Sequence, residues 1–233
     1  MKELRPVIEI DVWSDLVCPW CWIAKKRFEK GLAAFEHKDN VIVRHHSFRI
    51  ADNKTALPYR EALNRKLGGP QRAEMMMSQV AAAGKEEGLN YLFDSMLFGD
   101  TEDALTLSAA ARRDGMGDEM TERLFQASVE EGRSIFDRDE LIKLATEVGM
   151  PAETAAAALD DAELRASVTA DENAARAMGA SGVPLYVFNH KYAISGAQPA
   201  DHFLSALRQV WDEKAEELDE GDGPACGMDG CKI

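Results

Sequence analysis

The sequence predicts an α/β protein in which a β-α-β unit and a later β-β-α unit form one domain around an inserted helical segment. Three observations support this. The first fifty residues alternate between strand-like and helix-like hydrophobic patterns, the pattern of residues 58–179 is almost entirely helical, and strand-like runs return only after residue 184. We therefore expect residues 1–57 and 180–218 to form one domain, residues 58–179 to form an all-helical insertion, and residues 219–233 to form a C-terminal tail.

The first unit is defined by two strand patterns that flank one helix pattern. Residues 7–13 alternate apolar and polar side chains and are rich in β-branched residues, and residues 41–48 read in the same way. A Cys-Pro-Trp-Cys motif follows the first strand. After it, apolar side chains recur at near-helical spacing, at Ile23, Phe28, Leu32 and Phe35. The motif therefore stands where the first strand gives way to the first helix.

The rest of the chain also divides into helix-like and strand-like segments. Gly, Asp and Pro interrupt the helical segment at several points, and Asp137 followed by Glu140 is typical of a capping box. Strand patterns return at 185–188 and 192–194, joined by a polar turn. A final helix is expected from about residue 199 to residue 217, with its apolar face toward the sheet.

The composition excludes several classes of partner. The 233 residues are 45% hydrophobic and 29% charged, as in an ordinary globular protein, and the formal net charge is -14. Such an acidic chain is a poor partner for nucleic acid or an anionic membrane. The one dense basic cluster, Lys25-Lys26-Arg27, is expected on the solvated face of a helix. A monomer and a dimer both fit this composition.

The N-terminal residues and the cysteines indicate in which cellular compartment the protein works. The first residues lack the apolar core of a secretory signal, and no later run approaches the roughly 18 apolar residues of a membrane span. We therefore expect a cytoplasmic protein. Its four cysteines form two close pairs, and in a reducing compartment such pairs are more often catalytic or metal-binding than structural.

The first pair has the features that thiol–disulfide exchange requires. The N-terminus of a helix presents unpaired N–H groups and the positive end of the helix dipole, which favour a thiolate at Cys18. Cys21 lies one turn further on the same face, within disulfide reach, and Pro19 suits the first helical position. We therefore expect Cys18 to be the nucleophile and Cys21 the resolving thiol.

A zinc site is the alternative for this pair. A zinc-binding C-x-x-C is usually completed by a second pair 15 to 20 residues away or by nearby histidines. The next cysteine is Cys226, and only His37 occurs in the 20 residues after Cys21. We therefore expect no metal here.

The second pair, Cys226 and Cys231, allows three interpretations. Its intervening glycines would let a small disulfide loop close. We favour an auxiliary redox pair that exchanges with Cys18 and Cys21. A staple for the tail comes second, and a thiolate metal site completed by histidines comes third.

The whole pattern resembles a known family. A strand, C-P-W-C opening a helix, a helical segment and Gly-Val-Pro before the next strand look like the DsbA-like branch of the thioredoxin superfamily. The cytoplasmic FrnE-type subgroup is the most similar, because it also carries a C-x4-C near its C-terminus. The resemblance implies a thioredoxin fold. It also implies a cis peptide bond before Pro184, packed against the cysteine pair, and a Val183 backbone that pairs with the substrate chain.

Several other residues near these motifs allow more than one interpretation. Asp11 falls near the buried acid of thioredoxins, but with one residue more before Cys18, so a solvent-facing or capping role stays open; Asp15 equally suits a turn. His45 and His46 are adjacent on a strand and face opposite sides, so ordinary core or surface histidines are expected rather than a chelate. Trp20 is expected to be exposed for substrate contact, beside Pro19.

The best functional interpretation is a thiol–disulfide oxidoreductase or isomerase acting on protein disulfides. It needs no cofactor beyond its own cysteines, with glutathione as a candidate reductant. Two alternatives remain open. One is a glutathione-dependent isomerase or transferase of the 2-hydroxychromene-2-carboxylate isomerase or kappa-class type, which typically has serine at the position of Cys18. The other is a non-enzymatic holdase or interaction protein.

Overall fold

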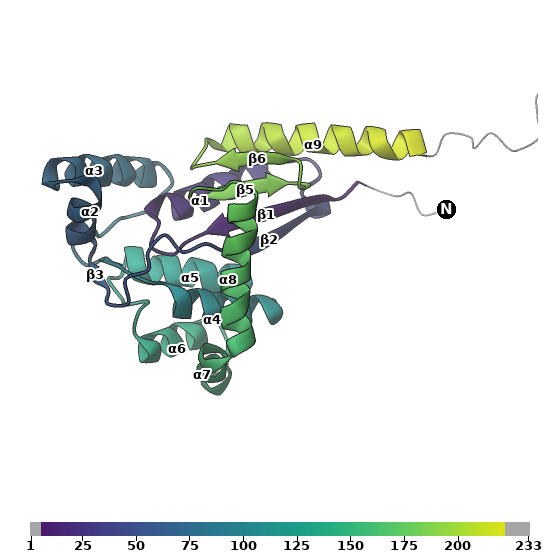
Figure 1. Ribbon diagram of the computed structural model, residues 1–233. Helices are drawn as coiled ribbons and strands as arrows, with labels where there is room; N and C mark the ends of the chain where they lie inside the picture. Colours follow the sequence, from purple (N-terminus) through teal and green to yellow (C-terminus); the bar gives the residue numbers. More distant parts are fainter. Residues whose placement is uncertain (1–5, 222–233) are drawn as a thin grey trace, which may run out of the picture.

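A four-stranded sheet forms the centre of the protein. The computed structural model describes residues 6–221, with side chains to residue 218, so Cys226 and Cys231 lie outside the described residues. The strand order is β2-β1-β5-β6, with β1 parallel to β2 and antiparallel to β5, and β5 antiparallel to β6 (Figure 1). The strands are β1 (Ile8–Ser14), β2 (Val41–Ser47), β5 (Leu185–Phe188) and β6 (Tyr192–Ser195).

Helices cover both faces of this sheet. Because side chains alternate along a strand, Ile8, Ile10 and Val12 of β1 point to the face covered by α1 (Pro19–Ala33) and α9 (Ala200–Gly221). Trp13 points to the other face, where α8 (Ala162–Ala177) packs (Figure 1). The predicted β-α-β and β-β-α order is confirmed as a thioredoxin fold.

The segment between β2 and β5 is predominantly helical, as predicted. Its helices before α8 are α2 (Tyr59–Leu67), α3 (Pro70–Glu86), α4 (Glu102–Arg113), α5 (Gly117–Val129), α6 (Arg138–Glu147) and α7 (Ala152–Asp160). A 3₁₀ turn, Lys38–Asn40, precedes β2, and a two-residue ladder joins β3 (Leu57–Pro58) to β4 (Leu97–Phe98). The ladder was not predicted, because two residues are too few to give an alternating pattern.

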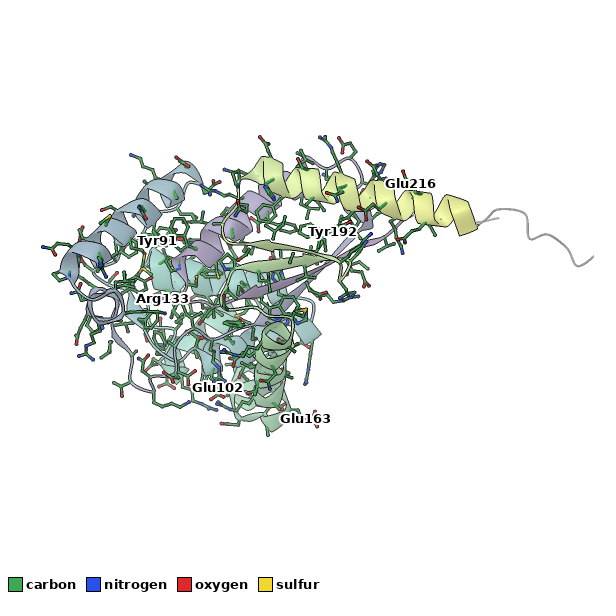
Figure 2. All side chains as sticks on the ribbon, turned by 45° about the horizontal axis from the view of Figure 1, so that its top comes forward. Tyr91, Glu102, Arg133, Glu163, Tyr192 and Glu216 are labelled. Atoms are coloured by element: carbon green, nitrogen blue, oxygen red, sulfur yellow. The ribbon has the colours of Figure 1, made fainter. Side chains whose placement is uncertain are left out.

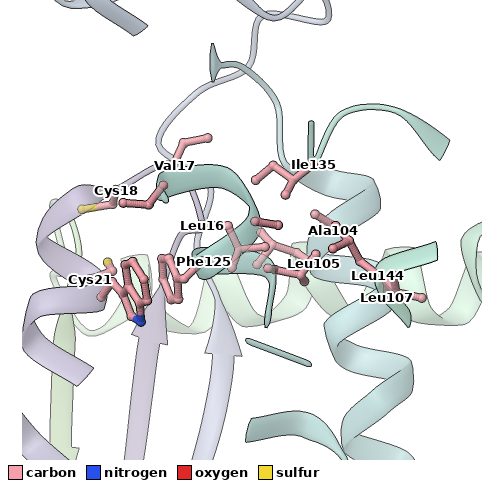
Figure 3. Close-up of a cluster of buried hydrophobic side chains, with 14 of the residues drawn as sticks. Leu16, Val17, Cys18, Cys21, Ala104, Leu105, Leu107, Phe125, Ile135 and Leu144 are labelled. Atoms are coloured by element: carbon pink, nitrogen blue, oxygen red, sulfur yellow. The ribbon is translucent and has the colours of Figure 1, made fainter. Parts of the chain in front are cut away.

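One apolar core continues from the cysteine pair into the inserted helices. Leu16, Val17 and both thiols lie in the same buried cluster as Leu105 of α4 and Phe125 of α5 (Figure 3). The middle of α4 is buried on every side, which makes it the central helix of the insertion. The insertion therefore supports the start of α1 directly.

Close helix packing fixes α1 on α9. At Gly31 of α1 a Cβ atom would lie 2.7 Å from the carbonyl oxygen of Ala200 and 3.1 Å from the Cβ of Phe203. Only a glycine permits this approach.

Among the described residues, no helix combines the length and apolar character that crossing a bilayer requires.

Candidate active site

The two cysteines occupy the first turn of α1, as predicted. Cys18 is the N-cap, with an extended backbone (φ -87°, ψ 110°), and Pro19 opens the helix. The amide of Cys21 donates to the carbonyl of Cys18 at 3.0 Å, which places the two residues one turn apart. Both are free thiols at one edge of the core cluster (Figure 3).

Both thiols are buried, although disulfide exchange with a large client requires an accessible sulfur atom. Cys18 is 5% exposed and Cys21 is 2% exposed. Burial, followed by the neighbouring Cys18, raises the pKa of Cys21 well above its usual value. Cys21 is therefore held as a protonated thiol at neutral pH.

A cis peptide bond lies beside the nucleophile. The Val183–Pro184 bond is cis, as the family resemblance implied. The Sγ of Cys18 lies 3.6 Å from the carbonyl oxygen of Val183 and donates to it. The structure therefore brings together Cys18, Cys21, Val183 and Pro184, although 165 positions separate Cys18 from Val183. Pairing of Val183 with a substrate stays a prediction.

Asp15 is the buried acid of this site. Its carboxylate accepts hydrogen bonds from the hydroxyl of Thr101 at 2.7 Å and from the amide of Ile50 at 2.6 Å, and it is fully buried. Burial raises its pKa to about 6. Its carbonyl also accepts the amide of Cys18 at 3.1 Å. Asp15 thus ties the loop before Cys18 to the insertion, which is more than the local turn considered from sequence.

Asp11 does not take part in the thiol site. It lies on the α8 face of the sheet, where its Oδ1 is 2.8 Å from Nε2 of His46. Nδ1 of His46 is 2.9 Å from Oδ1 of Asp171 on α8, and Trp13 stacks on the His46 ring. Burial alone would lower the pKa of His46, but the bonds to Asp171 and Asp11 raise it. The side chain that faces α1 is Val12, so the weak analogy between Asp11 and the thioredoxin acid is not supported.

Aromatic residues of the insertion complete the surroundings of the pair. The hydroxyl of Tyr91, in the loop after α3, donates to the carbonyl of Pro19 at 2.6 Å (Figure 2). Tyr59 at the start of α2 is also buried, and burial raises the pKa of both phenols. Both were missed from sequence, because they lie 38 or more positions from Cys21 in a segment that carries no motif.

The tryptophans beside the cysteines differ from each other. Trp22 is 2% exposed, stacks on Phe125 and donates from its indole nitrogen to Glu122 at 3.1 Å. Trp20 is half-buried and packs against the core cluster, so it is less exposed than expected. Its contact with a substrate stays a prediction, as does that of Pro19, which is buried.

Lys25 corrects the expectation of a solvated basic cluster. It is 6% exposed and forms ion pairs with Glu29, with Asp118 at 3.0 Å and with Glu122 at 3.4 Å. Burial opposes its charge, but these carboxylates raise its pKa. The reason is that α5 of the insertion packs beside α1 and covers this face.

The described part of the chain has no grouping of three or more His, Cys, Asp or Glu side chains that could hold a metal ion. The tail cysteines, Cys226 and Cys231, lie outside the described residues. The described site is thus built from two thiols, a buried carboxyl and a cis-proline loop.

Comparison with known proteins assigns the family. The DSBA-like thioredoxin domain model matches residues 9–208, and the chain therefore belongs to this family of thiol–disulfide oxidoreductases. A solved structure described as a probable DsbA oxidoreductase, SCO1869 from Streptomyces coelicolor, is 35% identical, with a TM-score of 0.84 over 97% of this chain and 99% of that one.

Two further relatives extend the comparison. The uncharacterized protein YwbO of Bacillus subtilis is 28% identical over 206 residues, which cover 86% of this chain and 96% of YwbO. The cytosolic disulfide reductase DsbM from Pseudomonas aeruginosa, solved with GSH, is 19% identical, with a TM-score of 0.63 over 91% of this chain and 99% of DsbM. At that identity DsbM shows a shared fold.

Proposed function

We propose that the protein is a cytoplasmic thiol–disulfide oxidoreductase or isomerase that acts on protein disulfides through Cys18 and Cys21. One observation carries the proposal. Two free thiols lie in the first turn of α1, and the sulfur of Cys18 touches the carbonyl of Val183 in the cis-proline loop. This arrangement offers a client disulfide both a nucleophile and an adjacent backbone edge.

In the reducing direction, the reaction consists of two exchanges. The Cys18 thiolate attacks one sulfur of a client disulfide, and the other client sulfur leaves as a thiolate and takes up a proton. Cys21 then loses its proton and attacks the Cys18 sulfur, which releases the second client thiolate. The products are a client dithiol and a Cys18–Cys21 disulfide, so two electrons have passed to the client.

The same steps run backwards when the client is a dithiol, and the reduction potential of the pair sets the direction. An isomerase stops at the mixed disulfide, and another client thiol displaces Cys18. We further propose glutathione as the reductant. Two glutathione molecules would reduce the Cys18–Cys21 disulfide and leave as one glutathione disulfide.

Binding of the client would use the residues that surround Cys18. We propose that the backbone of Val183 pairs with an extended client segment, with Pro19 and Trp20 alongside. Cys226 and Cys231 would act as an auxiliary redox pair. The protein is proposed to act as a monomer or dimer, without nucleic acid or membrane.

The test is the reduction potential of the Cys18/Cys21 pair in glutathione buffers, measured by mass spectrometry after thiol trapping. It should be run with Cys226 and Cys231 intact and again with both changed to serine. We expect a reversible disulfide in both backgrounds and none in Cys18→Ser or Cys21→Ser. A potential near -270 mV would indicate a reductase, and a much higher one an oxidase or isomerase.

Two outcomes would overturn the proposal. Glutathione-dependent turnover of a small electrophile that survives Cys21→Ser would point to the isomerase or transferase class. Suppression of client aggregation that is unchanged in Cys18→Ala, without reversible disulfide formation, would point to a holdase.

A further inference from the structure

A cavity of about 690 Å³ lies behind the cysteine pair. It is bounded by α1, the edge strand β2, and the region where α4 ends and α5 begins, and its inner end reaches Cys21. Most of its wall is apolar. The apolar and aromatic side chains that line it are Val12, Phe28, Leu32, Val43, Phe125 and Tyr186. Its volume is typical of a site for a small molecule.

Arg112 lines this cavity. The side chain lies in the last turn of α4 and is three-quarters buried, and Gly117 packs so tightly against it that a Cβ there would lie 2.3 Å from its Cγ. Its nearest acid, Asp171, is 3.7 Å away, and the guanidinium donates no hydrogen bond to any residue that the structure describes. Burial lowers the pKa of Arg112. Its N–H donors therefore lack acceptors within this part of the protein.

The acidic side chains around the cavity are already engaged. Asp171 accepts from the amide of Ser47 at 2.9 Å and pairs with His46. Glu29 and Asp118 both pair with Lys25. Arg112 forms only a long ion pair with Asp171, at 3.7 Å, and Asp171 accepts shorter hydrogen bonds from other groups, so the Arg112 guanidinium keeps donors for an anion from outside the chain.

His45 supplies a second polar group. It lines the same cavity, its Nε2 is 3.7 Å from Asp118, and its ring makes no hydrogen bond within the described residues. Burial lowers its pKa to about 4, so the ring is neutral at pH 7 and can donate or accept one hydrogen bond.

We propose that this cavity binds a small organic anion, with its carboxylate on Arg112, a polar atom near His45 and an apolar body against Phe28 and Phe125. A planar carboxylate matches the fork of the guanidinium. The body would extend toward Cys21, which lines the same cavity. This site is separate from the face of Cys18 that touches Val183, and it does not depend on the proposed redox activity.

Isothermal titration calorimetry with 2-naphthoate, and with 2-naphthamide as its neutral analogue, tests the site. We expect the wild-type protein to bind the naphthoate at least about tenfold more tightly than the amide, because a carboxylate forms charge-assisted hydrogen bonds with the guanidinium and a neutral amide does not. Arg112→Gln should remove this preference. Arg113→Gln is the matched control, because the neighbouring arginine is exposed and does not line the cavity.

A second variant tests the cavity without changing Arg112. Val43→Trp adds bulk to the cavity wall from the edge strand and leaves Arg112 in place, so it should abolish binding of both probes. Circular dichroism checks that each variant is folded. A wild-type protein that binds neither probe, a naphthoate affinity that survives Arg112→Gln, or equal affinity for acid and amide would each overturn the proposal.

Discussion

At the residue scale, a shift of one position decides which side chain faces the thiols. In β1, Val12 points toward α1, and Asp11 points to the other face, where it binds His46. Because successive side chains of a strand point to opposite faces of the sheet, Asp11 and Val12 cannot both face α1. The acid near the cysteines is instead Asp15, in the loop, where three hydrogen bonds from Thr101, Ile50 and Val17 hold it.

The first prediction concerns Asp15. An ordinary Asp titrates near 3.9 when unfolded, and burial moves the folded pKa to about 6, so the native state binds the proton more tightly. The contribution of Asp15 to the free energy of unfolding should therefore fall by about 3 kcal/mol in total between about pH 3 and pH 7, of which about 2 kcal/mol is lost between pH 4.5 and pH 7. Asp15→Asn should lack this decline. Urea denaturation at pH 4.5 and pH 7 measures it, and identical pH profiles for the two proteins would contradict it.

The second prediction concerns Cys21. Only a thiolate is alkylated, and burial together with Cys18 holds the pKa of Cys21 far above its usual value. In a Cys226→Ser/Cys231→Ser background at pH 7.5, iodoacetamide should modify Cys18 at least about tenfold faster than Cys21. Peptide mapping by mass spectrometry gives both rates. Comparable rates would show that Cys21 is neither buried nor protonated as described.

At the element scale, the long amphipathic and alternating segments were predicted well. The four strands of the main sheet and the helix after the C-P-W-C motif lie where their periodicities placed them, because each buries one regular face. The short β3–β4 ladder was missed. Its geometry depends on contacts between segments 40 positions apart, such as the hydrogen bond from the Tyr59 amide to the carbonyl of Met96.

The third prediction tests the packing of α1 on α9. In an exposed helix, glycine to alanine is favourable by about 1 kcal/mol. At Gly31 the new Cβ would meet Ala200 and Phe203, so Gly31→Ala should instead lower the free energy of unfolding by roughly 1–3 kcal/mol. Gly182→Ala is the control, because nothing lies within 4 Å of a Cβ there. Urea denaturation compares the two, and stabilisation by Gly31→Ala would refute this close packing.

At the scale of the whole molecule, charged groups join the insertion to the sheet. Arg49, just after β2, pairs with Glu172 of α8, with Asp100 at 3.4 Å and with Glu102 of α4 at 3.3 Å. Glu172 and the side chain of Asp100 are nearly buried. One arginine therefore pairs with three carboxylates from two segments, residues 100–102 and α8, that meet only in the folded chain.

The fourth prediction follows from this junction. Arg49→Met would leave Glu172 and Asp100 without their arginine and should lower the free energy of unfolding by about 3 kcal/mol. Adding Glu172→Gln should restore part of the loss. Arg138→Met, which breaks an exposed pair with Asp160, should cost less than about 1 kcal/mol. Equal effects of the two arginine changes in urea denaturation would contradict the role given to Arg49.

The sequence predicted the reacting groups better than their surroundings. Cys18, Cys21 and Pro184 stand in local motifs, and the structure places them together. Asp15, Tyr91 and Arg112 have no motif, and each owes its setting to partners distant in the chain. Periodicity reports which face of an element is buried, but not which neighbour covers it. The burial of Lys25 beneath α5 could not be predicted for that reason.

The direction of α9 determines where the described part of the chain ends. Gly31 touches Phe203 and Phe35 packs on Trp211, so α9 runs away from Cys18 and projects past the sheet (Figure 1). At 1.5 Å per residue its 22 residues extend about 33 Å, so α9 carries the end of the described chain well away from the helical turn that holds Cys18.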